Sequence, residues 1–212
     1  MLDVGCGAGA WTEILAARCG FVIGFEQSAS MVRSAKARRV DERRVEIRQA
    51  DVREDLPEGP FDLIFVGGLC MYLNDVDLIL WLRSLQGRLA LSGSVVLRES
   101  TVPTGRTSAK GGDWAVYRSV DTYRRLFQRA GFSAPEVRRN HAYTAMEVAI
   151  ELVELRRRRL TFLPTDSSVL GALTWWSLRC AGPNSFRFLP RFVSKFGSTW
   201  PRSQNHFFRL RG

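Results

Sequence analysis

Near its beginning the chain reads Leu2-Asp3-Val4-Gly5-Cys6-Gly7-Ala8-Gly9, an apolar run that leads directly into three closely spaced glycines. Apolar residues at helical spacing follow from about Ala10 to Cys19. The stretch therefore marks the point where a buried strand turns into a helix. Glycines at such a turn can adopt positive φ and let the backbone approach a ligand closely. The helix that follows directs its unpaired N–H groups and the positive end of its dipole at the same place.

An acidic residue, Glu26, follows the short apolar run from Phe21 to Phe25. A carboxylate at the end of the second strand can accept hydrogen bonds from both hydroxyls of a ribose. The glycine turn and Glu26 together predict a binding site for a cofactor that contains a nucleoside.

Two classes of cofactor fit the glycine turn. Gly5, Gly7 and Ala10 satisfy the dinucleotide pattern G-x-G-x-x-G/A, which leaves a nicotinamide-dinucleotide oxidoreductase open. Asp3 argues against that interpretation, because a carboxylate repels a pyrophosphate and attracts a cationic amino acid cofactor.

Strands and helices alternate through the first two thirds of the chain. Further strands are expected at Val45–Arg48, Phe61–Val66, Ser94–Arg98 and Glu136–Arg139, and further helices at about Ala29–Arg39, Asp75–Leu89 and Val120–Ala130. This alternation predicts a single α/β domain over 1–212 with a doubly wound, mostly parallel, Rossmann-like sheet. Its ligand crevice should lie at the carboxyl ends of the strands.

The last third breaks this rhythm. Residues 1–143 are expected to form the cofactor-binding core, and 144–204, which are rich in proline and aromatic residues, a cap or insertion. A final strand over 205–212 should then return to the sheet. Because the first strand begins at Met1, we expect the N-terminus of this chain to be truncated.

The opening stretch resembles the first motif of class I S-adenosylmethionine-dependent methyltransferases. Gln49-Ala50-Asp51-Val52 is similar to the third-strand motif of these enzymes, and Asp62-Leu63-Ile64-Phe65 is similar to their fourth strand. The resemblance extends over about residues 1–135. It implies S-adenosylmethionine as cofactor, with the ribose on Glu26. The cofactor-binding residues that it implies are Asp3, Gly5, Cys6, Gly7, Gly9, Glu26, Gln27, Asp51, Val52 and Gly67.

The resemblance has two departures that bear on the methyl acceptor. The helices that normally precede the first strand are not in this sequence. The segment from Val66 to Tyr72 lacks the Asn/Asp-Pro-Pro-Tyr pattern of enzymes that methylate base or glutamine amino groups. We therefore expect a small-molecule acceptor, with an RNA-modifying methyltransferase as the alternative.

Methyl transfer from a sulfonium disperses charge, so alignment of the reactants and exclusion of water are the main tasks of the protein. A general base is needed only where the acceptor must lose a proton. The candidates beyond the fourth to sixth strands are His141, Glu99 and Tyr72. Each also has a structural interpretation: His141 as a polar loop histidine, Glu99 as an ion-pair partner of Arg98 or a helix cap, and Tyr72 as a packing tyrosine.

A glycine-flanked loop after the fifth strand is the candidate substrate loop. Its proposed substrate residues are Asp113, Trp114 and Tyr117. The competing interpretation is a surface loop whose aromatic residues have no binding role.

Composition limits the remaining options. The 31 basic and 21 acidic residues give a net charge of +10, which permits an anionic substrate, nucleic acid or peripheral contact with a membrane, or reflects an arginine-rich coding bias. The four cysteines form no CxxC pair, so we expect a reduced, cytoplasmic protein without a metal. No stretch reaches the roughly 18 apolar residues that a transmembrane segment needs. A non-enzymatic protein that keeps the fold also stays open.

Overall fold

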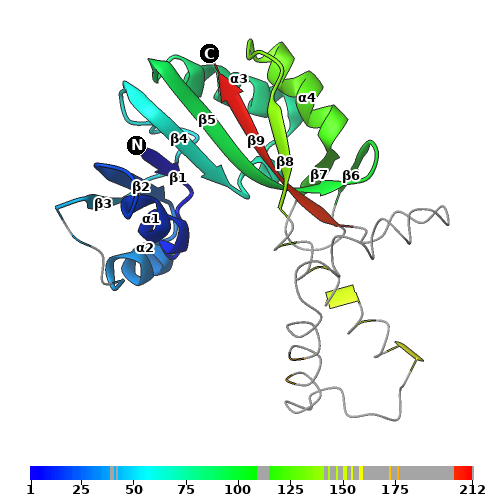
Figure 1. Ribbon diagram of the computed structural model, residues 1–212, viewed down its shortest axis with the longest axis horizontal. Coiled ribbons are helices and arrows are strands. Elements are labelled where there is room, and N and C mark those ends of the chain that lie inside the picture. Colours follow the sequence, from blue (N-terminus) through cyan, green and yellow to red (C-terminus); the bar gives the residue numbers. More distant parts are fainter. Residues whose placement is uncertain are drawn as a thin grey trace.

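The computed structural model describes residues 1–38, 41, 43–108, 115–140 and 203–211, with isolated positions between 143 and 176 (Figure 1). Its strands are β1 (Leu2–Val4), β2 (Val22–Glu26), β3 (Val45–Gln49), β4 (Phe61–Gly67), β5 (Leu89–Val102), β6 (Arg106–Ser108), β7 (Val116–Ser119), β8 (Glu136–Arg139) and β9 (Gln204–Arg211). Its helices are α1 (Ala10–Ala16), α2 (Ala29–Lys36), α3 (Asp75–Gln86) and α4 (Val120–Arg129), with a 3-10 turn η1 (Cys70–Tyr72).

The strands form one sheet in which β3-β2-β1-β4-β5 run parallel. β9 pairs antiparallel with β5, and β8 pairs antiparallel with β9. The predicted α/β class with a mostly parallel sheet is thereby confirmed. Because parallel strands end at one edge, the turns after β1, β2, β3 and β4 meet there.

Neighbouring phenylalanines on β9 show that helices cover both faces of the sheet, because successive side chains of a strand point to opposite faces. The ring of Phe207 lies 6.1 Å from that of Trp11 on α1. The ring of Phe208 lies 5.2 Å and 5.4 Å from those of Tyr123 and Phe127 on α4. The sheet is therefore doubly wound, with α1 on one face and α4 on the other; both helices are labelled in Figure 1.

The fifth strand differs most from its prediction. Helix α3 ends at Gln86 instead of Leu89, and β5 begins at Leu89 instead of Ser94. The carbonyl of Arg88 accepts a hydrogen bond from the Phe61 amide at 2.9 Å, so sheet pairing starts where helical spacing predicted another turn of helix. β5 also continues beyond Arg98 to Val102.

The extension of β5 changes the expected substrate loop. Tyr117 lies in strand β7, which pairs with the end of β5 through Thr101 and Arg118, so its placement in a loop is wrong. Asp113, Trp114 and His141 lie outside the described residues, as does most of the predicted insertion 144–204. Within the described part of the chain, no helix is long and apolar enough to span a membrane.

Helix α3 offers a matched pair of leucines for testing the core. Leu78 is fully buried in the main hydrophobic cluster, whereas Leu80 is 57% exposed on the same helix. Leu78→Ala should lower the free energy of unfolding by about 2–5 kcal/mol, because it removes buried methyl groups and leaves a cavity. Leu80→Ala should change it by less than about 0.5 kcal/mol. Urea denaturation measures both, and similar losses in the two variants would contradict this packing of α3.

Candidate active site

The turn after β1 has the backbone conformation that its glycines predict. Gly5, Gly7 and Gly9 have φ values of +68°, +55° and +78°, which side chains rarely tolerate. A Cβ on Gly9 would also lie 3.1 Å from the Cβ of Ala35 on α2. The amide of Cys6 donates to the Phe25 carbonyl at 2.9 Å, which fixes the turn against the end of β2.

Glu26 joins this turn to the segment after β2. Its Oε2 accepts a hydrogen bond from the Gly7 amide at 3.0 Å, and its Oε1 accepts one from the Ser28 amide at 2.8 Å. Each carboxylate oxygen has two lone pairs, so acceptor capacity remains on both. Two hydroxyl groups of a bound sugar could therefore still donate to this carboxylate.

A cleft opens between this turn and the loops after β3 and β4. It is lined by Gly5, Glu26, Gln27, Ala50, Asp51, Val52, Arg53, Leu69, Tyr72 and Leu73. Five of the predicted cofactor-binding residues, Gly5, Glu26, Gln27, Asp51 and Val52, come together here, and so does Tyr72.

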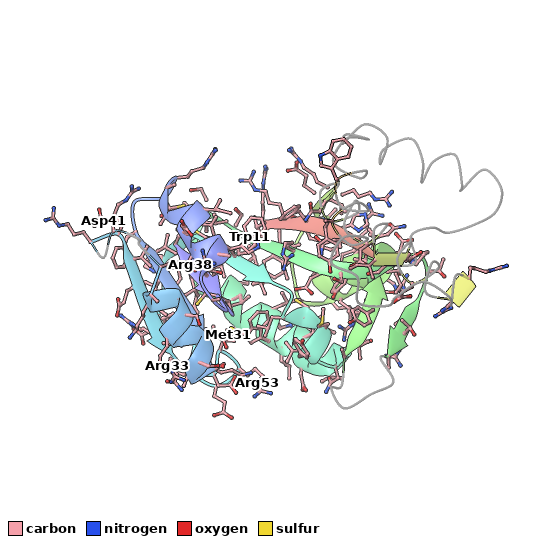
Figure 2. The ribbon with its side chains drawn as sticks, turned by 90° about the horizontal axis from the view of Figure 1, so that it is seen from below. Trp11, Met31, Arg33, Arg38, Asp41 and Arg53 are labelled. Atoms are coloured by element: carbon pink, nitrogen blue, oxygen red, sulfur yellow. The ribbon has the colours of Figure 1, made fainter. Side chains whose placement is uncertain are left out.

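The β3 side of the cleft is held by two interactions. Arg53, labelled in Figure 2, forms a two-pronged ion pair with Asp51, including an Nε–Oδ1 contact of 2.9 Å. Hydrogen bonds from Arg53 hold the pKa of Asp51 below its ordinary value. The indole N–H of Trp81 on α3 donates to the Val52 carbonyl at 3.0 Å. Asp51 is therefore a charged side chain on a loop that Trp81 of α3 holds in place.

The other predicted cofactor residues lie behind this surface. Asp3 is 1% exposed and accepts a hydrogen bond from the Thr12 hydroxyl at 2.6 Å. Burial raises the pKa of the Cys6 thiol to about 12, so Cys6 contributes its backbone and a neutral side chain. Gly7, Gly9 and Gly67 do not line the cleft; Gly7 and Gly9 shape the turn, and Gly67 ends β4.

Of the three candidate bases, Tyr72 lines the cleft and is 52% exposed. Glu99 is fully buried behind η1, where its Oε1 accepts a hydrogen bond from the Cys70 amide at 3.2 Å. Burial raises the pKa of Glu99 to about 7. Glu99 therefore supports the wall of the cleft from below and does not open onto it.

Sequence reasoning missed four lining residues, Ala50, Arg53, Leu69 and Leu73. Ala50 lies within the Gln49-Ala50-Asp51-Val52 motif and Arg53 follows it directly, so the motif could have indicated both residues. Leu69 and Leu73 lie around a 3-10 turn that no apolar periodicity predicts. Within the described ranges, no group of three or more His, Cys, Asp or Glu side chains is arranged to hold a metal.

The strand order, the glycine turn after β1 and the acid after β2 resemble those of class I S-adenosylmethionine-dependent methyltransferases. Residues 1–93 match the family model of a methyltransferase domain. The resemblance predicted from the motifs is thereby confirmed for the part of the chain that builds the cleft.

Two curated relatives match parts of the chain. Phosphoethanolamine N-methyltransferase 1 of Arabidopsis thaliana is 27% identical over 131 residues, 60% of this chain and 27% of that protein. Trans-aconitate 2-methyltransferase of Azoarcus sp. is 39% identical over 77 residues, 35% of this chain and 29% of that protein. The matched stretches are thus less than a third of either relative's length.

Solved structures show the same fold. The O-methyltransferase of a Brevibacillus brevis trans-AT PKS multienzyme, in complex with S-adenosyl-L-homocysteine, superposes with a TM-score of 0.63 at 16% identity. That alignment covers 99% of this chain and 65% of the other.

The buried carboxyl of Asp3 makes stability depend on pH. Burial raises its pKa from 3.8 to about 6, so the neutral form is favoured in the folded state. This contribution to stability is complete below pH 3.8 and is lost as the pH rises through about 6. The shift of about two pKa units corresponds to about 3 kcal/mol.

In Asp3→Asn the side chain stays neutral and can still accept the Thr12 hydrogen bond. The free energy of unfolding of the wild type minus that of Asp3→Asn should therefore fall by about 2.5 kcal/mol between pH 4 and pH 7, because the rest of the loss occurs below pH 4. Chemical denaturation at each pH measures it, with Asp121→Asn, whose side chain is 74% exposed, as the control. A difference that stays constant with pH would contradict the burial of this carboxyl.

Proposed function

We propose that this chain is the catalytic domain of an S-adenosylmethionine-dependent methyltransferase that acts on a small molecule. The observation that carries the proposal is one cleft in which the Gly5 turn, Glu26 and Asp51 meet at the carboxyl ends of β1, β2 and β3. The methyltransferase match over residues 1–93 supports it independently.

The residues of the cleft fit the cofactor. Glu26 has acceptor capacity for two ribose hydroxyls. Asp51 lines the same cleft on the side where the adenine would lie, with its carboxylate held by Arg53. Asp3, ionised above about pH 6, contributes negative charge beneath the turn where the cationic end of the cofactor would lie. When bound, S-adenosylmethionine supplies a methyl group on a positively charged sulfonium.

The chain's own part in the reaction is to orient the reactants and exclude water. Val52, Leu69 and Leu73 give the cleft apolar walls. Tyr72 is exposed at the cleft on the β4 side, so we propose that it borders the methyl acceptor. Glu99 is too deeply buried to touch the acceptor in this arrangement. Asp113, Trp114 and His141 stay predictions for the acceptor side.

A small acceptor is favoured over RNA or a lipid surface. Both curated relatives are named for small anionic acceptors, phosphoethanolamine and trans-aconitate, and the net charge of +10 suits an acceptor of that kind. No feature of the described ranges favours nucleic acid or membrane contact. The described cysteines, Cys6, Cys19 and Cys70, are free, which supports a reducing compartment such as the cytoplasm.

Ligand binding to the native state should be visible as thermal stabilisation. S-adenosylhomocysteine at about 100 times its Kd should add about 2.7 kcal/mol by mass action. For a chain of this size that is a rise in Tm of roughly 5–10 °C. Differential scanning fluorimetry measures it, with NADH at the same concentration as the comparison. A rise with NADH and none with S-adenosylhomocysteine would favour the oxidoreductase interpretation instead.

Glu26 should contribute directly to the affinity. Glu26→Ala removes a charged acceptor and should weaken S-adenosylhomocysteine binding by about 1.5–3 kcal/mol, a Kd increase of roughly 10- to 150-fold. Glu13→Ala is the control, because Glu13 lies on α1 in an exposed ion pair with Arg38. Isothermal titration calorimetry of both folded variants measures the change. An unaltered Kd in Glu26→Ala would remove this carboxylate from the site.

A further inference from the structure

The β4 side of the cleft is formed by residues 69–73, a segment too short to be stable by its local hydrogen bonds alone. Leu69, Tyr72 and Leu73 line the cleft, and between them the chain makes a single 3-10 turn. Within this turn the Tyr72 amide donates to the Leu69 carbonyl at 3.0 Å and the Leu73 amide to the Cys70 carbonyl at 3.3 Å. One such turn has poor hydrogen-bond geometry and little stability alone, so its position must come from its surroundings.

A buried arginine forms hydrogen bonds with both ends of this turn. Arg118 on β7 is fully buried, and its Nη1 donates to the Cys70 carbonyl at 2.9 Å while its Nη2 donates to the Leu73 carbonyl at 2.6 Å. Its Nε donates to Asp75 Oδ1 at 2.8 Å, at the first residue of α3. The guanidinium also lies 5.8 Å from the centre of the Tyr123 ring.

Glu99 on β5 binds the same turn from a second strand. Its carboxylate accepts the Cys70 amide, so the amide and the carbonyl of Cys70 are both bound by buried ionisable side chains. Removing a charged side chain from water is costly, and a planar guanidinium recovers that cost only where several acceptors match its fork. Here the acceptors are the backbone of the cleft wall itself.

We propose that Arg118 is a positioning residue, which acts through the backbone of Cys70 and Leu73 to set Tyr72 and Leu73 against the bound cofactor and acceptor. β7 exists at this place because the end of β5 pairs with it through Thr101 and Arg118. The pairing of β7 with the long β5 therefore places Arg118 on the side of the cleft opposite Glu26. There its hydrogen bonds to Cys70, Leu73 and Asp75 form a clamp on the 3-10 turn. This inference rests on the proposed function for the identity of the ligand, but the clamp can be tested without it.

The principal variant is Arg118→Lys, which keeps the charge but cannot bridge the two carbonyls and Asp75 at once. Hydrogen–deuterium exchange followed by mass spectrometry should show faster exchange in peptides that cover Cys70–Asp75 and unchanged exchange in β1–β3. A role in overall stability alone would raise exchange throughout the chain. The Kd for S-adenosylhomocysteine should rise by about tenfold or more.

Arg106→Lys is the matched control. Arg106 also contacts Asp75, at 3.2 Å, but its side chain is 66% exposed. It should leave exchange at Cys70–Asp75 and the Kd within about twofold of the wild type, as is usual for exposed ion pairs. Equal effects of Arg106→Lys and Arg118→Lys would overturn the proposal.

If Arg118→Lys does not fold, Asp75→Asn carries the test, because it removes the negative charge that anchors the Arg118 Nε. The same substitution also removes the partner of the exposed Arg106. It should speed exchange in Cys70–Leu73 and raise the Kd in the same direction, by less. Wild-type exchange and Kd in whichever of these variants folds would refute the clamp. Failure of the wild type to bind S-adenosylhomocysteine would instead refute the proposed function, while the exchange data would still decide the clamp.

Discussion

The double hydrogen bond on Glu26 is the constraint from which the site is built. Its carboxylate takes one amide from the glycine turn after β1 and one from the segment after β2. Neither segment has regular structure of its own at that point, so the carboxylate, together with the hydrogen bond from the Cys6 amide to the Phe25 carbonyl, sets the distance between them. Glu26 also lines the cleft, so the carboxylate that joins the two segments is the same one that is proposed to bind the ribose.

The two walls of the cleft are held in place in different ways. On the Glu26 side, glycines with positive φ bring the backbone close to the ligand. On the η1 side, Arg118 and Glu99 hold the backbone from beneath, through hydrogen bonds at both ends of the turn. The first wall depends on residues with almost no side chain, and the second on large buried side chains that never reach the cleft.

The sequence predicts the first wall well and the second poorly. Asp3 to Gly9, Glu26 and Asp51 are local signals, because a strand end, a turn and one acid each specify their own structure. Arg118 carries no such signal, since an arginine between Tyr117 and Ser119 is usually a surface residue. Its burial depends on β5 running on to Val102 and pairing with β7, and that pairing joins segments whose own patterns are short and polar.

The two errors of element assignment have the same cause. Leu85 and Leu89 keep helical spacing, so the pattern extends the helix, yet the Arg88 carbonyl pairs with β4 instead. Tyr117 follows glycines, so the pattern predicts a loop, yet Val116–Ser119 is a strand. In both places a contact with a distant strand overrides the local preference.

A crystal structure with S-adenosylhomocysteine tests the central claim most directly. The account predicts both ribose hydroxyls within hydrogen-bond distance of Glu26, whose bonds to Gly7 and Ser28 persist, and Tyr72 and Leu73 against the ligand. A ligand bound elsewhere, or one whose ribose leaves the Glu26 carboxylate untouched, would contradict it.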